Sequence, residues 1–168
     1  MAFTPTAFNE GAAPGISAAE LNKLGTQYAL ASTKEIFIPT TYGVDMGAPG
    51  FVPGALINAV ADTAFIEFYV PLDFTSITSA VVVRVAQATA THRLNYASYY
   101  GSAGQAYSTH NETLADQDTA ETANVIYEQD ISGILTSLVA GDYVSIYVLG
   151  DATNVPNDQI IGVRFKYA

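Results

Sequence analysis

A group of tyrosines is the feature of this sequence whose residue types and spacing best suit binding chemistry. Tyr96, Tyr99, Tyr100 and Tyr107 follow one another around a single expected hairpin. Tyrosine rings can stack on sugars, and they can also act as amphipathic anchors in protein interfaces. Tyr96 and Tyr100 share one face of an alternating strand while Tyr99 faces the other way, so one binding surface cannot contain all four if either face is core. Burial in the core or in a subunit interface is therefore favoured over a carbohydrate site.

Acidic residues form a second group that could do chemistry, as ligands of a cation. Asp116, Asp118 and Glu121 offer carboxylate oxygens at the short spacing that calcium sites use. The run lacks the central glycine of an EF-hand loop and continues into an expected strand, so a solvated acidic turn is favoured and no metal is predicted. A further polar group lies between the last two expected strands. It could coordinate a cation or cap turns, and turn capping is favoured. It consists of Asp151, Asn154, Asn157 and Asp158.

Residues suited to catalysis are few. The chain has two histidines, His92 and His110, and none of the motifs of zinc proteases, serine hydrolases or nucleotide-binding loops. His92 and Arg93 open an expected strand, where a surface or rim pair that bonds to a neighbouring strand is favoured over a catalytic base. The glycine-flanked run at 101–104 follows a strand and is interpreted as a hairpin turn. We therefore predict no enzymatic activity and no cofactor.

Charge and composition exclude several kinds of partner. Six Lys and Arg against 16 Asp and Glu give a formal net charge of −10, which repels nucleic acids and anionic membrane surfaces. The absence of cysteine excludes disulfides, thiolate metal sites and cysteine nucleophiles. The longest apolar run, at 80–83, ends at Arg84 and is far too short to span a bilayer, and the first residues contain no secretory signal. Only 13% of the residues are charged, which favours contacts buried between subunits.

The chain is expected to divide into an amino-terminal arm with a helix, residues 1–34, and a body, residues 35–168. Residues 17–20 form a capping box, and Ile16 before it can pack on Leu21. Leu21, Leu24 and Tyr28 then recur at helical spacing and complete a narrow apolar stripe. Because a helix of this length is marginal alone, the stripe is predicted to serve attachment or oligomerisation.

The body is predicted to consist of β-strands. From Ala64 onward, side chains alternate with a period of two, which indicates half-buried strands. Residues 39–63 are expected to form a glycine- and proline-rich connector with short edge pairing at most, and the polar run through Asp118 is expected to be a loop. Residues 131–138 are expected to form a short helical turn over one end of a sheet. About seven or eight strands without parallel crossovers predict an all-β antiparallel sandwich of the jelly-roll type. The expected strands are 35–38, 64–70, 81–86, 94–100, 123–128, 144–148 and 161–167.

Parts of the sequence are similar to proteins of tailed bacteriophages. Residues 8–24, which end in P-G-I-S-A-A-E-L-N-K-L, resemble the segment that opens many tail-fibre and minor virion proteins. Gly150 stands where this group would have an arginine, so any ion pair made there is absent or replaced. The resemblance implies an attachment role for the first segment and a symmetric, commonly trimeric, virion protein. Further segments resemble small β-sandwich proteins encoded among phage structural genes: residues 68–74, 122–124, 140–148, 151–154 and 162–168.

The predicted function is that of a non-enzymatic structural protein of a phage virion, assembled as a homo-oligomer, expected to be a trimer, on the capsid or tail. Its partners would be other copies and other virion proteins, and it would be made in the host cytoplasm and released by lysis. One alternative is a carbohydrate- or receptor-binding module for a host-surface glycan, with the four tyrosines and Asn95 or Gln105 in its site. A second alternative is a subunit of an extracellular filament, in which the arm completes a neighbour's sheet edge.

Overall fold

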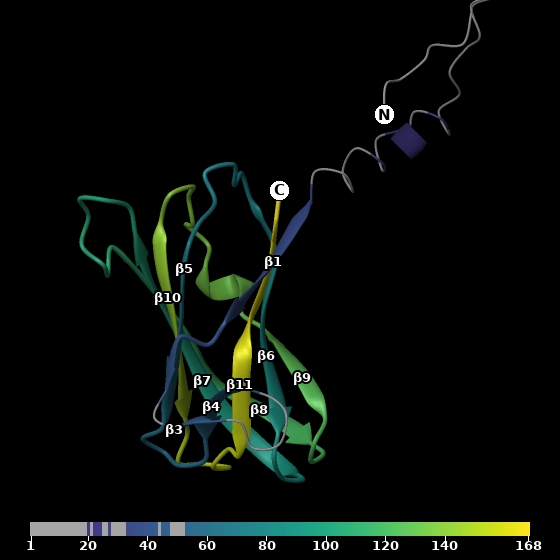
Figure 1. Ribbon diagram of the computed structural model, residues 1–168, viewed down its shortest axis with the longest axis vertical. Coiled ribbons are helices and arrows are strands. Elements are labelled where there is room, and N and C mark those ends of the chain that lie inside the picture. Colours follow the sequence, from purple (N-terminus) through teal and green to yellow (C-terminus); the bar gives the residue numbers. More distant parts are fainter. Residues whose placement is uncertain (1–19, 21, 25–26, 28–32, 44, 48–52) are drawn as a thin grey trace, which may run out of the picture. The chain divides into compact units, whose positions relative to one another are not determined.

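The computed structural model divides the chain into two units, Met1–Thr33 and Lys34–Ala168. It describes residues 20, 22–24, 27, 33–43, 45–47 and 53–168 (Figure 1). In the first unit residues 20, 22–24 and 27 are helical, and the side chain of Leu24 is exposed. Ile16, Leu21 and Tyr28 lie outside the described residues, so the attachment role of the apolar stripe stays a prediction. The described residues include no helix with the length and apolarity needed to cross a membrane.

The second unit is a sandwich of two antiparallel sheets (Figure 1). One sheet has the strand order β3-β4-β11-β6-β9, with β1 also paired to β11, and the other has the order β2-β5-β10-β7-β8. Successive strands change sheet from β4 to β7 and again from β8 to β11, which is jelly-roll topology, so the predicted fold is confirmed. The elements are β1 (Lys34–Pro39), β2 (Tyr42–Gly43), β3 (Asp45–Gly47), β4 (Gly54–Ile57), β5 (Thr63–Tyr69), β6 (Ile77–Ala86), β7 (Ala90–Gly101), β8 (His110–Glu121), β9 (Ile126–Asp130), the 3-10 helix η1 (Ser132–Ile134), β10 (Tyr143–Gly150) and β11 (Asp158–Tyr167).

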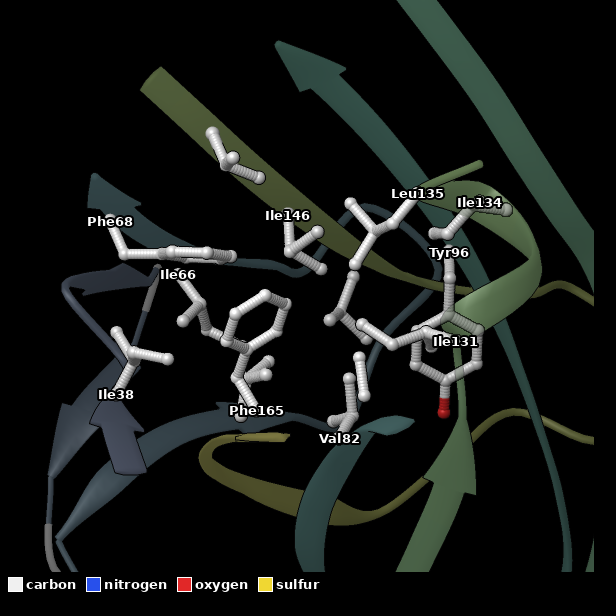
Figure 2. Close-up of a cluster of buried hydrophobic side chains, with 14 of the residues drawn as sticks. Ile38, Ile66, Phe68, Val82, Tyr96, Ile131, Ile134, Leu135, Ile146 and Phe165 are labelled. Atoms are coloured by element: carbon white, nitrogen blue, oxygen red, sulfur yellow. The ribbon is translucent and has the colours of Figure 1, made fainter. Parts of the chain in front are cut away.

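The core lies between the sheets and is built by the alternation of the strands. Ile66 in β5 and Ile146 in β10 are fully buried and are paired in register. Phe165 enters from the opposite sheet, and its ring lies beside Ile66 in Figure 2. The ring of Phe68 is 5.3 Å from that of Phe165. Each fully buried side chain of this size contributes about 1.5–3 kcal/mol, so the alternating strands supply most of the force that holds the sheets together.

One end of the core is filled by the segment around η1. Ile131, Ile134 and Leu135 are buried and surround the ring of Tyr96 (Figure 2). The hydroxyl oxygen of Ser132 accepts a 2.9 Å hydrogen bond from the backbone N–H of Ala80 in β6. The predicted helical turn over one end of a sheet is therefore confirmed, as a single 3-10 turn.

Strand β8 corrects the prediction of a polar loop through Asp118. Its twelve residues pair with β7 alone, at the edge of the sheet. An edge strand that water reaches can carry polar and charged side chains. Leu114, which packs against the core, is its one large apolar residue. The strand was missed because it lacks the apolar alternation from which strands are predicted.

A register shift interrupts the alternation in β11. Strict alternation over the predicted strand 161–167 would place Ile161 on the inward face with Val163 and Phe165, but Ile161 is only partly buried, whereas Ile160 is fully buried. The pairing of β11 with β6 is irregular between Ile160 and Gly162. One extra residue at a bulge moves the side chains that precede it to the opposite face of the sheet.

Candidate functional site

The outer face of the β2-β5-β10-β7-β8 sheet carries aromatic side chains where a solvated sheet face normally carries polar ones. In β5 and β10 the aliphatic positions enter the core, so the alternate positions must point outward. A group of large apolar side chains on an open face marks a binding surface more often than a lone one does. The outward side chains are Phe65, Glu67 and Tyr69 in β5 and Tyr143, Ser145 and Tyr147 in β10.

Strand register arranges these side chains in rows across the sheet. Ser145, on the middle strand β10, stands opposite Glu67 of β5 and Tyr99 of β7. Directly opposite residues of antiparallel strands have their Cβ atoms about 5 Å apart, so the side chains of a row are neighbours. A polar row therefore lies between two rows that carry rings. The flanking rows are Tyr69, Tyr143 and Gly101 on one side and Phe65, Tyr147 and Ala97 on the other.

A hollow of about 570 Å³ lies on this face. Its volume falls in the range of small-molecule binding sites. Ser145 and Gly101 are small, so the rings around them stand higher than the floor. The ring centroids of Phe65 and Tyr147 are 5.0 Å apart. The hollow is lined by Phe65, Glu67, Tyr99, Gly101, Tyr107, Tyr143, Ser145 and Tyr147.

Tyr107 reaches the hollow from the loop between β7 and β8. Its ring centroid lies 6.3 Å from that of Tyr99. The loop holds itself in place, because the backbone N–H of Ser102 donates a 2.9 Å hydrogen bond to the side-chain oxygen of Gln105. The hydroxyl of Ser102 donates a 2.6 Å hydrogen bond to Asp142, which precedes β10. These bonds position an exposed ring at the rim of the hollow.

The structure divides the four predicted tyrosines into two pairs. Tyr99 and Tyr107 line the hollow, whereas Tyr96 and Tyr100 are buried in the core. The hydroxyl oxygen of Tyr96 points away from the apolar side chains around its ring (Figure 2). Strand alternation places Tyr99 on the face opposite Tyr96 and Tyr100, and Tyr107 reaches that outer face from the loop, so the structure does not bring all four rings into one surface. The two polar residues expected beside them, Asn95 and Gln105, are not among the residues that line the hollow.

Most of the hollow was missed from the sequence. Of the residues that line the hollow, only Tyr99 and Tyr107 were predicted as candidate site residues. The predicted site did not include Phe65, Glu67, Tyr143 or Tyr147. The available signal was that residues 65–69 and 143–147 place rings on the face opposite the aliphatic one. A strand with one aliphatic and one aromatic face has two apolar faces, of which a sandwich can bury only one.

The polar groups of the hollow suit hydrogen bonding to a neutral ligand. Glu67 offers carboxylate oxygens as acceptors, and the Ser145 hydroxyl can both donate and accept. The backbone N–H of Glu67 donates a 3.1 Å hydrogen bond to the hydroxyl of Thr41, which helps to fix this part of β5. Among the described residues that line the hollow, Glu67 is the one carboxylate and no histidine is present.

A second group of functional side chains is buried between the sheets, and we call it the buried charge cluster: Arg84, His92, Tyr96, Glu121 and Asp158. The Nε–H of Arg84 donates a 3.0 Å hydrogen bond to Glu121, and a second nitrogen of its guanidinium donates one of 3.0 Å to the hydroxyl of Tyr96. His92 Nδ1 lies 3.0 Å from Glu121 Oε2 and 3.1 Å from Asp158 Oδ1. His92 was expected at the surface or rim and is instead 2% exposed, since it shares the inward face of β7 with Tyr96.

Burial and neighbouring charge shift the pKa values in the buried charge cluster. Burial, together with the nearby carboxyl of Glu121, raises the pKa of Asp158 from 3.8 to about 7. Burial raises the pKa of Tyr96 to about 12, so its phenol stays neutral. Burial alone would lower the pKa of Arg84, but Tyr96, Glu121 and Asp158 raise it above its ordinary value. The guanidinium thus pairs with the carboxyls, and the raised pKa of Asp158 favours a proton on that carboxyl.

His92, Glu121 and Asp158 are also close enough to be considered as metal ligands. One ligand atom from each lies within 4.8 Å of the others. Arg84 already supplies a cation here, since its guanidinium bonds Glu121 and its Nε lies 3.7 Å from Asp158 Oδ2. A divalent ion at this place would lie beside the Arg84 guanidinium and be repelled by it. The geometry therefore favours a protonated ion-pair network.

The three residues considered as calcium ligands are not brought together. The Glu121 side chain belongs to the buried charge cluster. Asp118 binds Arg93 with both carboxylate oxygens, at 2.9 and 2.6 Å, and Asp116 lies 3.5 Å from the same guanidinium. Asp118 also accepts a 3.0 Å hydrogen bond from Asn154. Arg93 thus takes the place that a cation would need, and its ion pair lowers the pKa of Asp118 to about 2.

The polar group between β10 and β11 serves two purposes. Asp151 accepts a 2.7 Å hydrogen bond from the backbone N–H of Thr153, which is the turn capping predicted from the sequence. Asn154 adopts a positive φ of 52°, a conformation that asparagine tolerates. Asp158 departs from the prediction, because it lies in β11 and is fully buried in the charge cluster.

Comparison with protein-family models finds no match, and comparison with the curated proteins finds none either. Among solved structures, one that is similar is described as "Carbohydrate-Binding Module CBM36 in complex with calcium and xylotriose", with 15% identity, a TM-score of 0.41, and coverage of 79% of this chain and 98% of that one. Another is the CBM36-1 domain of a multidomain xylanase from the hindgut metagenome of Trinervitermes trinervoides, with 13% identity, a TM-score of 0.42, and coverage of 80% and 98%. With TM-scores this low, the likeness assigns neither a ligand nor a function to the present chain.

Proposed function

We propose that this chain is a carbohydrate-binding domain whose outer sheet face binds a glycan in the hollow. The observation that carries the proposal is a set of aromatic rings around a polar floor of Glu67 and Ser145. A sugar ring has apolar C–H faces and a rim of hydroxyl groups. Aromatic rings can cover the faces, and the polar floor can hydrogen-bond to the rim. Sites for small molecules combine these two kinds of surface in the same way.

The site is built on elements that need little rearrangement before binding. β10 pairs with β5 on one side and β7 on the other, so its outward side chains stand on a fully paired strand. Ser145 lies between Val144 and Ile146, which are both fully buried. A site of fixed shape loses less conformational entropy on binding than a flexible one.

The chemistry of the hollow supports binding without bond cleavage. Most glycoside hydrolases use two carboxyl groups that flank the scissile bond. Glu67 is the single carboxylate among the described lining residues. The absence of enzymatic activity therefore remains our prediction for this domain.

Truncating exposed rings of the hollow tests the proposal. Tyr143 is 67% exposed and Tyr107 is 81% exposed, so Tyr143→Ala and Tyr107→Ala should fold. Each should weaken binding about fivefold, since one well-placed ring contact contributes on the order of 1 kcal/mol. Binding is measured by calorimetry with the glycans found on an array of neutral and acidic oligosaccharides.

Phe37→Ala is the matched control, because Phe37 is 51% exposed on β1 of the other sheet. It should bind the same glycans with unchanged affinity. An array without any bound glycan, or an equal loss in all three variants, would contradict the proposal.

The virion prediction, with its trimer, its partners and its release by lysis, stays a prediction. It offers a different occupant for the aromatic face, namely a second copy of the chain. Light scattering after size exclusion distinguishes the two. A monomer leaves the face free for a glycan, whereas a trimer that Tyr143→Ala dissociates would assign the face to subunit contact.

A further inference from the structure

We infer that the hollow selects glycans without acidic groups and that the carboxylate of Glu67 sets this selectivity. The inference rests on the proposed glycan-binding function and names the chemical class of its ligand. It follows from the placement of the charged side chains of Lys34–Ala168 relative to the hollow.

Glu67 lies at the β5 end of the polar row, next to Ser145. Its side chain is exposed, and it stands directly opposite Ser145 on β10. Within the part of the chain that the structure describes, its carboxylate makes no hydrogen bond and no ion pair to another side chain. Both oxygens are therefore available to accept hydrogen bonds from sugar hydroxyls, and their charge is not offset by a neighbour.

The basic side chains of Lys34–Ala168 are all engaged by carboxylates on other parts of the sandwich. None of them lines the hollow. Four lie in β1, β6 and β11, the strands of the opposite sheet, and Arg93 bonds to the edge strand β8. The pairs are Lys34 with Asp73, Arg84 with Glu121 and Asp158, Arg93 with Asp116 and Asp118, Arg164 with Glu35 and Glu128, and Lys166 with Glu35.

A uronate, sulfate or phosphate in this hollow would therefore meet a carboxylate and no cation. The whole chain adds a background of −10. Two like charges about 6 Å apart weaken binding about threefold at the dielectric constant of water and about a hundredfold at an effective value of about 20, so we expect an effect of about tenfold at this open site. A neutral glycan meets no such penalty, and its hydroxyls gain a charged acceptor in Glu67. The same carboxylate thus favours one class of glycan and disfavours the other.

The test compares polysaccharides that share a backbone and differ in charge. Suitable pairs are hydroxyethyl cellulose with carboxymethyl cellulose, methyl-esterified pectin with polygalacturonate, and dextran with dextran sulfate. Affinities are measured by calorimetry at low salt and again at high salt. The wild-type chain should bind the neutral member of at least one pair about tenfold more tightly. The difference should shrink at high salt, because screening acts on the repulsion alone.

Two variants assign the effect to Glu67. Glu67→Gln should reduce the difference within a pair to about threefold or less. Asp116→Asn removes the same charge from an exposed site on β8 outside the hollow, so it should keep the full difference.

The outcomes separate the two proposals. Absence of binding to every glycan on the array and in the pairs would overturn the glycan-binding function itself. Equal or tighter binding of the acidic member would overturn the selectivity while leaving glycan binding intact. A full difference in Glu67→Gln would overturn the role given to Glu67.

Discussion

Replacing Asp158 with Asn should abolish a loss of stability that the native domain suffers between about pH 4 and pH 7. The folded-state pKa of Asp158 is raised to about 7, above its ordinary value of 3.8, because the carboxyl is buried beside Glu121. Between these values the folded chain holds a proton that the unfolded chain has released. Stability is therefore fully present below pH 3.8 and falls as the pH rises toward 7. Asparagine has no proton to lose, and its amide can still form hydrogen bonds in the cluster.

The size of the effect follows from the two pKa values. One pKa unit corresponds to 1.36 kcal/mol, so the shift from 3.8 to about 7 corresponds to a loss of about 4 kcal/mol across that range. This is a large share of the roughly 5–15 kcal/mol that stabilise an ordinary domain. Other acidic groups act at lower pH. Asp118, whose pKa is lowered to about 2, contributes stability that is lost only as the pH falls below 3.8.

Urea unfolding at pH 4, 5, 6 and 7 measures this prediction. The wild type should lose stability steadily over this range, while Asp158→Asn should show a much flatter profile. Asp118→Asn is the control and should keep the wild-type slope. A wild-type slope that survives in Asp158→Asn would refute the reasoning. A carboxyl carbon NMR titration of the wild type checks the same point directly, and ionisation of Asp158 near pH 4 would refute it without any substitution.

Two further predictions concern packing. Phe165→Ala should cost about 3–5 kcal/mol of stability, because the ring is fully buried and lies 5.3 Å from the ring of Phe68; urea unfolding measures this, and a cost below about 1 kcal/mol would contradict the assigned core. Gly101→Ala would place a Cβ 2.8 Å from the carbonyl oxygen of Ala106, so the 102–109 loop must move. We expect weaker glycan binding and changed NMR shifts confined to that loop and the hollow, whereas unchanged binding would show that the loop does not shape the site.

The sandwich could be predicted because its central strands have one clearly aliphatic face. Residues 64–70 and 144–148 alternate cleanly, and the structure confirms both as parts of β5 and β10. In these strands every second side chain is buried against the opposite sheet and must be apolar. The alternation in the sequence therefore reports burial directly. Prediction failed where that force is weak, as in β8, which lies at an edge and meets water.

The buried charge cluster could not be predicted from local pattern. His92 and Glu121 are 29 residues apart, and His92 and Asp158 are 66 apart. Each residue also had an ordinary local explanation, as a strand opening, an acidic turn or a turn cap. Only the pairing of β7 with β8, and the packing of β11 from the other sheet, brings the three side chains together.

Strand β7 shows why binding and stability should be separable in this domain. Its inward positions carry His92, Tyr96 and Tyr100, and its outward position Tyr99 lines the hollow. The pleat places adjacent residues on opposite faces, so Tyr99 and Tyr100 differ by one position and by the whole thickness of the sheet. Substitutions on the inward face act on the core or on the buried charge cluster, so they should lower the free energy of unfolding. Substitutions on the outward face remove ligand contacts from a strand that stays paired on both sides, so they should lower the affinity for the ligand more than the stability.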